Sequence, residues 1–140
     1  MSTVPKFAEV NVGDSIPALL GAPISRLQLA LFASAACDHN PIHVDDDAAK
    51  AAKLDGVIAH GMLNMALLGS LVSGWASQKN LRYLNARFVS TATVGDQITC
   101  RGKVVAKDQA NGENLVQLEI TAENQRSEIV QKGSATVALP

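Results

Sequence analysis

The sequence is short of charge, of cysteine and of long uninterrupted hydrophobic runs. Charged residues make up 18% of the 140 residues, against 47% apolar residues, and the formal net charge is −1. A chain so nearly neutral has no strongly basic surface, so we expect no nucleic-acid partner. The low charge beside the high apolar content also favours an apolar surface that a partner subunit covers.

No stretch of the sequence is long enough to cross a membrane. The longest apolar segment, residues 62–76, is interrupted by Asn64, Ser70 and Ser73 and is shorter than the roughly 20 residues of a membrane-spanning helix. The first residues, Met1–Lys6, also lack the apolar core of a signal peptide. We therefore expect a cytoplasmic protein with no membrane span.

The two cysteines, Cys37 and Cys100, have neither metal-binding nor redox spacing. A single disulfide would be unusual in a cytosolic chain, so we interpret both as free thiols that behave as small buried hydrophobes. No metal site is predicted. The run Asp45, Asp46, Asp47 is interpreted as the acidic first turn of a helix, because consecutive helical residues point in different directions and cannot share an ion.

Apolar spacing divides the chain into an N-terminal part with helices and a C-terminal part made of strands. A turn and a short irregular strand are expected within residues 4–24. Ser25 is then the expected N-cap of a helix, in a capping box with Gln28. Helices are expected over the ranges 26–36, 45–53 and 61–76, and the last, which is apolar on nearly every side, is expected to be buried.

From residue 82 onward, apolar and polar residues alternate with a period of two, which is typical of strands with one solvated face. Turns are expected at residues 95–96, 111–112 and 123–127. Four sequential strands joined by short turns predict an antiparallel meander. The fold class is therefore α+β, an antiparallel sheet wrapped around one long central helix, in a single domain over residues 1–140.

One loop carries an acid and a base within reach of each other. Asp38 and His43 lie five residues apart, and Pro41 between them prevents an α-helix and pushes Asn40 towards extended geometry. A carboxylate and an imidazole that face one small volume can hold a water or exchange protons with a substrate. Asn40 is placed to orient Asp38 or that water.

A second part of the site is expected where the buried helix begins, at His60-Gly61-Met62. The first amides of a helix have no partner within it, and glycine lets a carbonyl approach closely, so the Gly61 N–H can stabilise an enolate oxygen. Together the two parts suit proton transfer next to a carbonyl. Taken singly, a loop hydrogen bond explains Asp38, core packing explains His60, and helix packing explains Gly61.

In this order, the segments 38–43 (DHNPIH) and 58–63 (IAHGML) resemble the motifs of a known enzyme family. This is the MaoC-like group of (R)-specific enoyl-CoA hydratases and (3R)-hydroxyacyl-thioester dehydratases. The similarity extends over essentially the whole chain, and within the group it is greatest to the dehydratase subunits of mycobacterial fatty-acid elongation. The resemblance implies the hot-dog fold and a dimer whose two sheets join into one.

The same resemblance implies a reaction. Asp38 and His43 would form a catalytic dyad that activates water for syn addition to a trans-2-enoyl thioester, yielding a (3R)-3-hydroxyacyl thioester. Asn40 would support the dyad, and the Gly61 N–H would bind the thioester oxygen. The substrate would carry CoA or the phosphopantetheine of an acyl carrier protein, and no cofactor is expected.

Four further positions are candidate substrate-binding residues. Gly69 and Val72 fall where members of the group line the acyl tunnel, and Trp75 follows on the same helix. Arg87 is a candidate for contact with CoA phosphates or an acidic carrier protein, although a solvated strand position explains it equally well. Many members have Ser-Gly where this chain has Ala36-Cys37, which leaves the dyad positions unchanged.

Two alternatives stay open. A hot-dog thioesterase would cleave the thioester, but such enzymes place a carboxylate on or beside the central helix, and residues 61–76 contain none. The chain can also be one subunit of a heterodimeric dehydratase instead of a homodimer, although the intact pair of Asp38 and His43 argues against an inert subunit.

Overall fold

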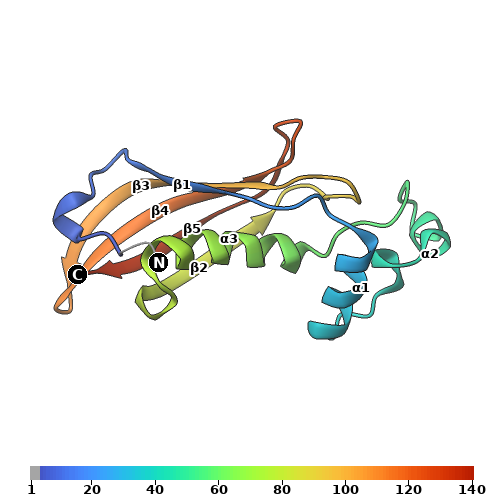
Figure 1. The fold of residues 1–140 in the computed structure, drawn as a ribbon, viewed down its shortest axis with the longest axis horizontal. Coiled ribbons are helices and arrows are strands. Elements are labelled where there is room, and N and C mark those ends of the chain that lie inside the picture. Colours follow the sequence, from blue (N-terminus) through green and yellow to red (C-terminus); the bar gives the residue numbers. More distant parts are fainter. Residues whose placement is uncertain (1–3) are drawn as a thin grey trace.

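The chain folds as a twisted antiparallel sheet with a long helix lying along it, described for residues 4–140 by a computed structural model (Figure 1). The elements follow in the order η1 (Phe7–Glu9), β1 (Ser15–Leu20), α1 (Arg26–Ala35), η2 (Pro41–His43), α2 (Asp46–Ala51), α3 (Gly61–Ala76), η3 (Gln78–Asn80), β2 (Leu81–Phe88), β3 (Thr99–Ala110), β4 (Glu113–Glu123) and β5 (Ile129–Leu139). Here η marks a short 3-10 helix. The expected α+β class is confirmed. Residues 1–3 of the segment examined for a signal peptide lie outside the described part.

The strand order is β1-β3-β4-β5-β2, and each neighbouring pair is antiparallel. The predicted meander is correct for β3, β4 and β5 but wrong for β2, which pairs with β5 at the edge of the sheet. The reason is that β1 occupies the other side of β3, so β2 cannot pair there. Residues 89–98 carry the chain from β2 at one edge of the sheet back to β3.

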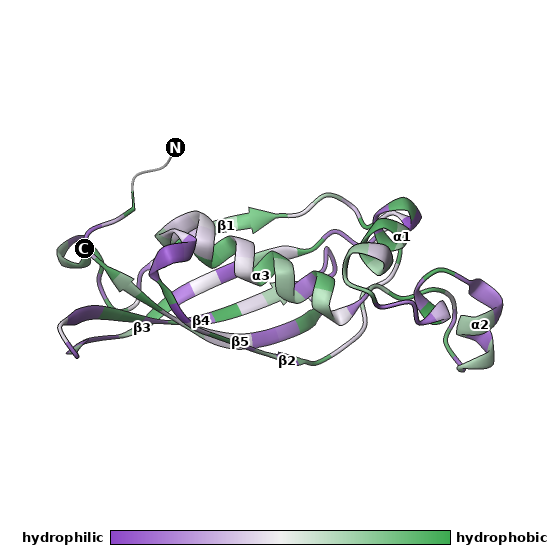
Figure 2. Cartoon of the chain, turned by 90° about the horizontal axis from the view of Figure 1, so that it is seen from below, coloured by the Kyte–Doolittle hydropathy of each residue, from purple (hydrophilic) through white to green (hydrophobic). Residues whose placement is uncertain are grey.

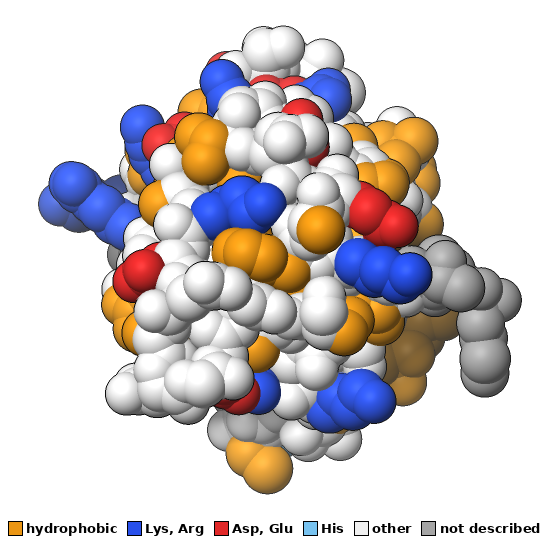
Figure 3. All heavy atoms as spheres, turned by 90° about the vertical axis from the view of Figure 1, so that its left-hand side faces the viewer, with side chains coloured by type: hydrophobic (Ala, Val, Ile, Leu, Met, Phe, Trp, Pro, Cys, Tyr) orange, Lys and Arg blue, Asp and Glu red, His pale blue; other side chains and the backbone are white. Residues whose placement is uncertain are grey.

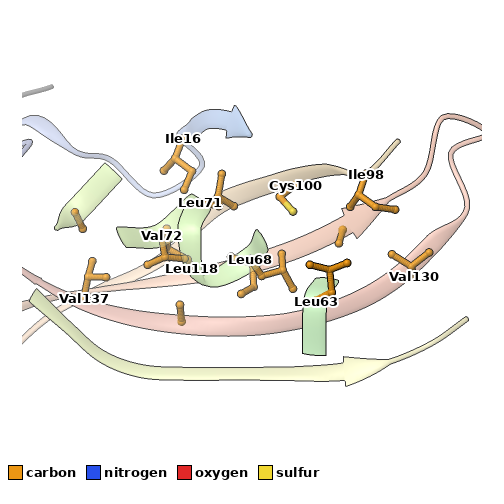
Figure 4. Close-up of a cluster of buried hydrophobic side chains, with 14 of the residues drawn as sticks. Ile16, Leu63, Leu68, Leu71, Val72, Ile98, Cys100, Leu118, Val130 and Val137 are labelled. Atoms are coloured by element: carbon orange, nitrogen blue, oxygen red, sulfur yellow. The ribbon is translucent and has the colours of Figure 1, made fainter. Parts of the chain in front are cut away.

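Helix α3 packs against one face of the sheet, as Figures 1 and 2 show from two sides. Its side chains Leu68 and Val72 are fully buried, and Figure 4 shows them in one cluster with Leu118 of β4 and Val137 of β5. Burying one side chain of this kind contributes about 1.5–3 kcal/mol. The cluster therefore holds α3 firmly, and with it the position of the helix N-terminus.

The caps of the two short helices form largely as predicted. The Ser25 hydroxyl accepts a hydrogen bond from the Gln28 N–H at 3.1 Å, but the reciprocal half of the capping box is missing, since Gln28 Oε1 is buried without a partner within residues 4–140. Asp45 caps α2 by accepting from the amides of Asp47 and Ala48. Both α1 and α2 lie beyond one end of the sheet (Figure 1).

The two cysteines have different surroundings. Cys100 is buried in β3, as predicted, whereas Cys37 is exposed, so the prediction of a buried thiol is wrong there. Cys37 follows the last turn of α1, where the backbone turns outward with φ of 52°. This left-handed conformation leads the chain towards Asp38 and leaves the thiol at the surface.

The surface described for residues 4–140 mixes charges of both signs. At the end of the molecule opposite α1 and α2, Lys and Arg side chains are interspersed with Asp and Glu and with apolar side chains (Figure 3). Within residues 4–140, each helix is too short or too polar to cross a membrane.

Candidate active site

Asp38 and His43 face each other from the two ends of one loop. After α1 ends, the Asp38 N–H donates to the carbonyl of Ala33 at 3.0 Å and turns the chain out of the helix. Pro41–His43 then form the single 3-10 turn η2 instead of irregular loop, because proline is well suited to the first position of a helix. His43 Nε2 lies 3.9 Å from Asp38 Oδ2.

The two members of this pair differ in exposure and in hydrogen bonding. The Asp38 side chain is 45% exposed, whereas that of His43 is 9% exposed. His43 Nδ1 lies 2.8 Å from the carbonyl oxygen of Ile58, which can only accept, so Nδ1 carries a proton and Nε2 faces the carboxylate. At 3.9 Å the pair is too far apart for a direct hydrogen bond, and a water bonded to both at about 2.8 Å fits between them.

Asn40 acts on Asp38 through its backbone. The Asn40 N–H donates to Asp38 Oδ1 at 3.3 Å, while the Asn40 side-chain oxygen accepts from the Ile42 N–H at 3.2 Å. The contact of Asn40 with Asp38 in this structure is thus made by the backbone, and a role of the side chain at the dyad stays a prediction. The side chain caps η2, a role for which asparagine is favoured at helix N-termini.

His60 lies against both members of the pair, a contact that was not predicted. Its ring is stacked on that of His43, with centroids 3.8 Å apart, and its Nε2 lies 3.3 Å from the backbone carbonyl of Asp38. Phe32 of α1 contacts the same ring at 4.9 Å. Burial lowers the pKa of His60, and the neighbouring His43 lowers it further. His60 therefore favours its neutral form, donating through Nε2.

Asp38, His43 and His60 bring three potential ligand atoms within 4.8 Å of one another. Their arrangement does not suit a metal ion. The two imidazole planes are only 26° apart, so their in-plane lone pairs point side by side, whereas metal ligands converge on one point. Within the cluster, the Asp38 carboxylate and the His43 imidazole are groups that can exchange protons.

Gly61 begins α3 beside this cluster. Its N–H has no acceptor within the helix, and none is found elsewhere in residues 4–140. A Cβ at this position would lie 3.0 Å from the ring of Phe88, so a larger residue would displace that ring. The Gly61 carbonyl accepts from Gln131 Nε2 at 2.6 Å. The contacts of Phe88 and Gln131 with Gly61 could not be predicted from local sequence, because only the strand register brings these residues to the helix.

The residues predicted to bind the acyl chain lie at different positions along α3 and differ in exposure. Val72 is fully buried in the core, and its contact with an acyl chain stays a prediction. Gly69 is half-buried beside Leu84. Trp75 lines a cleft of ≈ 380 Å³ against β1, roughly 21 Å along the helix from Gly61 at about 1.5 Å per residue. These three positions lie along α3 and not around the dyad.

Arg87 is exposed on β2, directly opposite Lys132 of β5. Within the described part of the chain, no ion pair involves either residue. Like charges placed opposite each other repel, and an anion would relieve that repulsion. The predicted position of Arg87 on a strand is confirmed.

Comparison with known proteins gives matches over most of the chain. The family described as "MaoC like domain" matches residues 8–125. An (R)-specific enoyl-CoA hydratase of Rhodospirillum rubrum is 28% identical over 96% of this chain and 91% of that protein. A 3-hydroxyacyl-thioester dehydratase Z of Mycobacterium tuberculosis is 32% identical over 71% of each. A fatty acid synthase subunit beta of Aspergillus oryzae is 31% identical over 84% of this chain, which spans only 7% of that protein's length.

The solved structures support the same assignment. The R-hydratase PhaJ1 of Pseudomonas aeruginosa in its unliganded form has a TM-score of 0.84 and 27% identity, covering 96% of this chain and 85% of that one. The sheet that packs on α3 is thus the hot-dog fold, as the sequence predicted. Since the family match covers 8–125 of the 140 residues, the chain belongs to the MaoC-like family of hydratases and dehydratases.

Proposed function

We propose that the chain reversibly hydrates trans-2-enoyl thioesters to (3R)-3-hydroxyacyl thioesters. The observation that carries the proposal is the spacing of 3.9 Å between Asp38 Oδ2 and His43 Nε2. The gap suits one water shared by a carboxylate and an imidazole. The names of the relatives, an (R)-specific enoyl-CoA hydratase and a 3-hydroxyacyl-thioester dehydratase, support this reaction class.

In the hydration direction, the water between Asp38 and His43 gives one proton to the dyad while its oxygen forms a bond to C3 of the substrate. The electron pair of the C2=C3 bond moves towards the thioester carbonyl, whose oxygen becomes an enolate. The Gly61 N–H donates a hydrogen bond to that oxygen as the charge develops. The dyad then returns the proton to C2, so water has been added and nothing else is consumed; dehydration is the same sequence reversed.

The hydrogen bond between His43 and Ile58 is important for this role. Because Nδ1 donates to a backbone carbonyl, the ring cannot rotate freely, and Nε2 remains the nitrogen that exchanges the proton. Burial of the ring also excludes bulk water from one side of the dyad. The half-exposed Asp38 leaves the other side open to substrate.

The carrier and the assembly are part of the proposal. We expect CoA or an acyl carrier protein to present the acyl group, with Arg87 and Lys132 as candidate contacts for phosphates. We also propose a homodimer, with a heterodimer as the alternative, because edge strand β2 exposes Tyr83 and Phe88. Light scattering on the purified chain measures the assembly directly.

Crotonyl-CoA tests the reaction. The purified chain alone is expected to convert crotonyl-CoA to (3R)-3-hydroxybutyryl-CoA. The reaction is followed by the loss of absorbance of the conjugated enoyl thioester. Release of free thiol from a saturated acyl-CoA without hydration would favour the thioesterase alternative. To identify the carrier, kcat/KM is measured for the same enoyl group attached to CoA and to a carrier protein, and the two values are compared.

A further inference from the structure

We infer that Gln131 is a positioning residue that fixes the direction of the Gly61 N–H. The inference rests on the proposed function, in which that N–H binds the thioester oxygen. Gln131 comes from β5, is only 1% exposed and donates through Nε2 to the Gly61 carbonyl oxygen at 2.6 Å. It therefore contacts the peptide unit next to the proposed oxyanion donor.

Gln131 acts together with Phe88. The two residues are directly opposite each other on β5 and β2, so both side chains leave the same face of the sheet, towards α3. The Phe88 ring packs beside the Cα of Gly61, and Gln131 holds its carbonyl. Glycine has the widest choice of backbone angles, and these two contacts restrict it. An N–H held in one direction needs no reorganisation when the oxyanion forms.

Packing alone does not explain a glutamine at this position. If the amide were reversed, Gln131 Oε1 would face the Gly61 carbonyl, and two acceptors cannot bond, so Nε2 must be the contacting atom. Oε1 is then buried, and no partner for it is found among residues 4–140. A methionine of similar length would fill the space without an unpaired polar atom. The bond that its N–H makes is thus what glutamine provides here and methionine cannot.

Replacing Gln131 with methionine removes the donor and keeps the volume. With crotonyl-CoA, Gln131→Met is expected to lower kcat at least about tenfold and to change KM less than about twofold, because a displacement of about 1 Å can cost about 10²-fold in rate. Gln117→Met, on the solvated face of β4, is the matched control and is expected to keep the wild-type kcat.

Gln131→Glu provides a readout that a purely structural role would not give. A protonated carboxyl can donate to the Gly61 carbonyl and an ionised one cannot, while burial raises the pKa of a carboxyl placed there. The kcat of this variant is therefore expected to fall with rising pH relative to wild type. His60 is the titratable residue next to Gly61, and it is present in both proteins. Melting curves at each pH separate unfolding from loss of catalysis.

Two results would overturn the inference: wild-type kcat in Gln131→Met, or a Gln131→Glu pH profile identical to that of wild type. If Gln131→Met does not fold, the Gln131→Glu profile decides. Wild-type activity in Asp38→Asn would instead reject the proposed function. The two failures are distinguishable because they concern different variants.

Discussion

The imidazole of His60 lies face to face with that of His43, with ring centroids 3.8 Å apart and planes 26° apart. His60 is 1% exposed and has Phe32 as a second aromatic neighbour. A proton on His60 would therefore be both poorly solvated and close to any charge that His43 gains during turnover. The neutral His60 ring therefore packs against the His43 ring and helps to hold it in place.

We predict that His60 titrates below the ordinary histidine value of 6.5, first because of burial and second because of His43. As the pH falls, the unfolded chain takes up this proton before the folded chain does. Neutral His60 therefore contributes to the free energy of unfolding above about pH 6.5. This contribution is lost as the pH falls through the pKa that His60 has in the folded protein. NMR titration of the imidazole C–H signals, assigned with His60→Phe, measures the value. A midpoint at or above 6.5 would contradict the prediction.

Asp96 gives a second pH dependence. Burial alone would raise the pKa of Asp96, but hydrogen bonds from Thr93, Gln125 and Arg126 outweigh it and hold that pKa below 3.8. The unfolded carboxylate protonates first on acidification, so stability is present above about pH 4 and is lost below it. At neutral pH, the free energy of unfolding of Asp96→Asn should be about 1.5–3 kcal/mol lower than that of wild type. On acidification, the variant should lose less of this free energy than wild type does. Equal acid sensitivity of the two proteins in urea unfolding would refute this.

Gly133 of β5 is a position where no side chain fits. A Cβ there would overlap the carbonyl oxygen of Asn85 and lie 2.8 Å from the Cα of Ala86, both in β2. Backbone cannot move aside as a side chain can, so Gly133→Ala should cost about 3 kcal/mol or more. In Gly74→Ala the new Cβ meets no atom within 4 Å, and that helical control should be as stable as wild type or more so. Urea unfolding of both variants measures the difference.

The two thiols should react at very different rates. Cys37 is exposed, whereas burial raises the pKa of the Cys100 thiol to about 11. Because the thiolate is the reactive form, one thiol per folded chain should react with a disulfide reagent at pH 8, and two after unfolding. Cys37→Ser should abolish the fast reaction. Reaction of two thiols in the folded chain would show that the core around Cys100 opens readily.

Parts of this fold are predictable because they depend on neighbouring residues. The buried helix follows from an apolar sequence over Gly61–Ala76, and the cap at Ser25 follows from its own side chain. The meeting of Asp38 and His43 was also predictable, since one proline turn brings them together. Local sequence did not indicate that the Asn40 side chain would cap η2.

Other parts depend on the pairing of distant strands. The edge position of β2 follows from competition between β1 and β2 for the side of β3, which no single segment reveals. The same pairing brings Phe88 and Gln131 together over Gly61. The role of Val72 in an acyl tunnel stays a prediction, because in this structure its side chain is buried in the core.

The dyad itself is tested by substituting each of its two residues separately. Asp38→Asn and His43→Ala should each lower kcat for crotonyl-CoA hydration by about 10²–10⁴-fold, the usual contribution of a general acid or base. The exposed residues Asp55 and His39 supply matched controls, Asp55→Asn and His39→Ala, which should keep most of the activity. Circular dichroism establishes that each variant is folded.

The most direct measurement is therefore kcat for crotonyl-CoA in folded Asp38→Asn and His43→Ala. Losses of about 10²-fold or more in both variants are predicted. Wild-type rates in both would contradict the proposal that these two side chains activate the water.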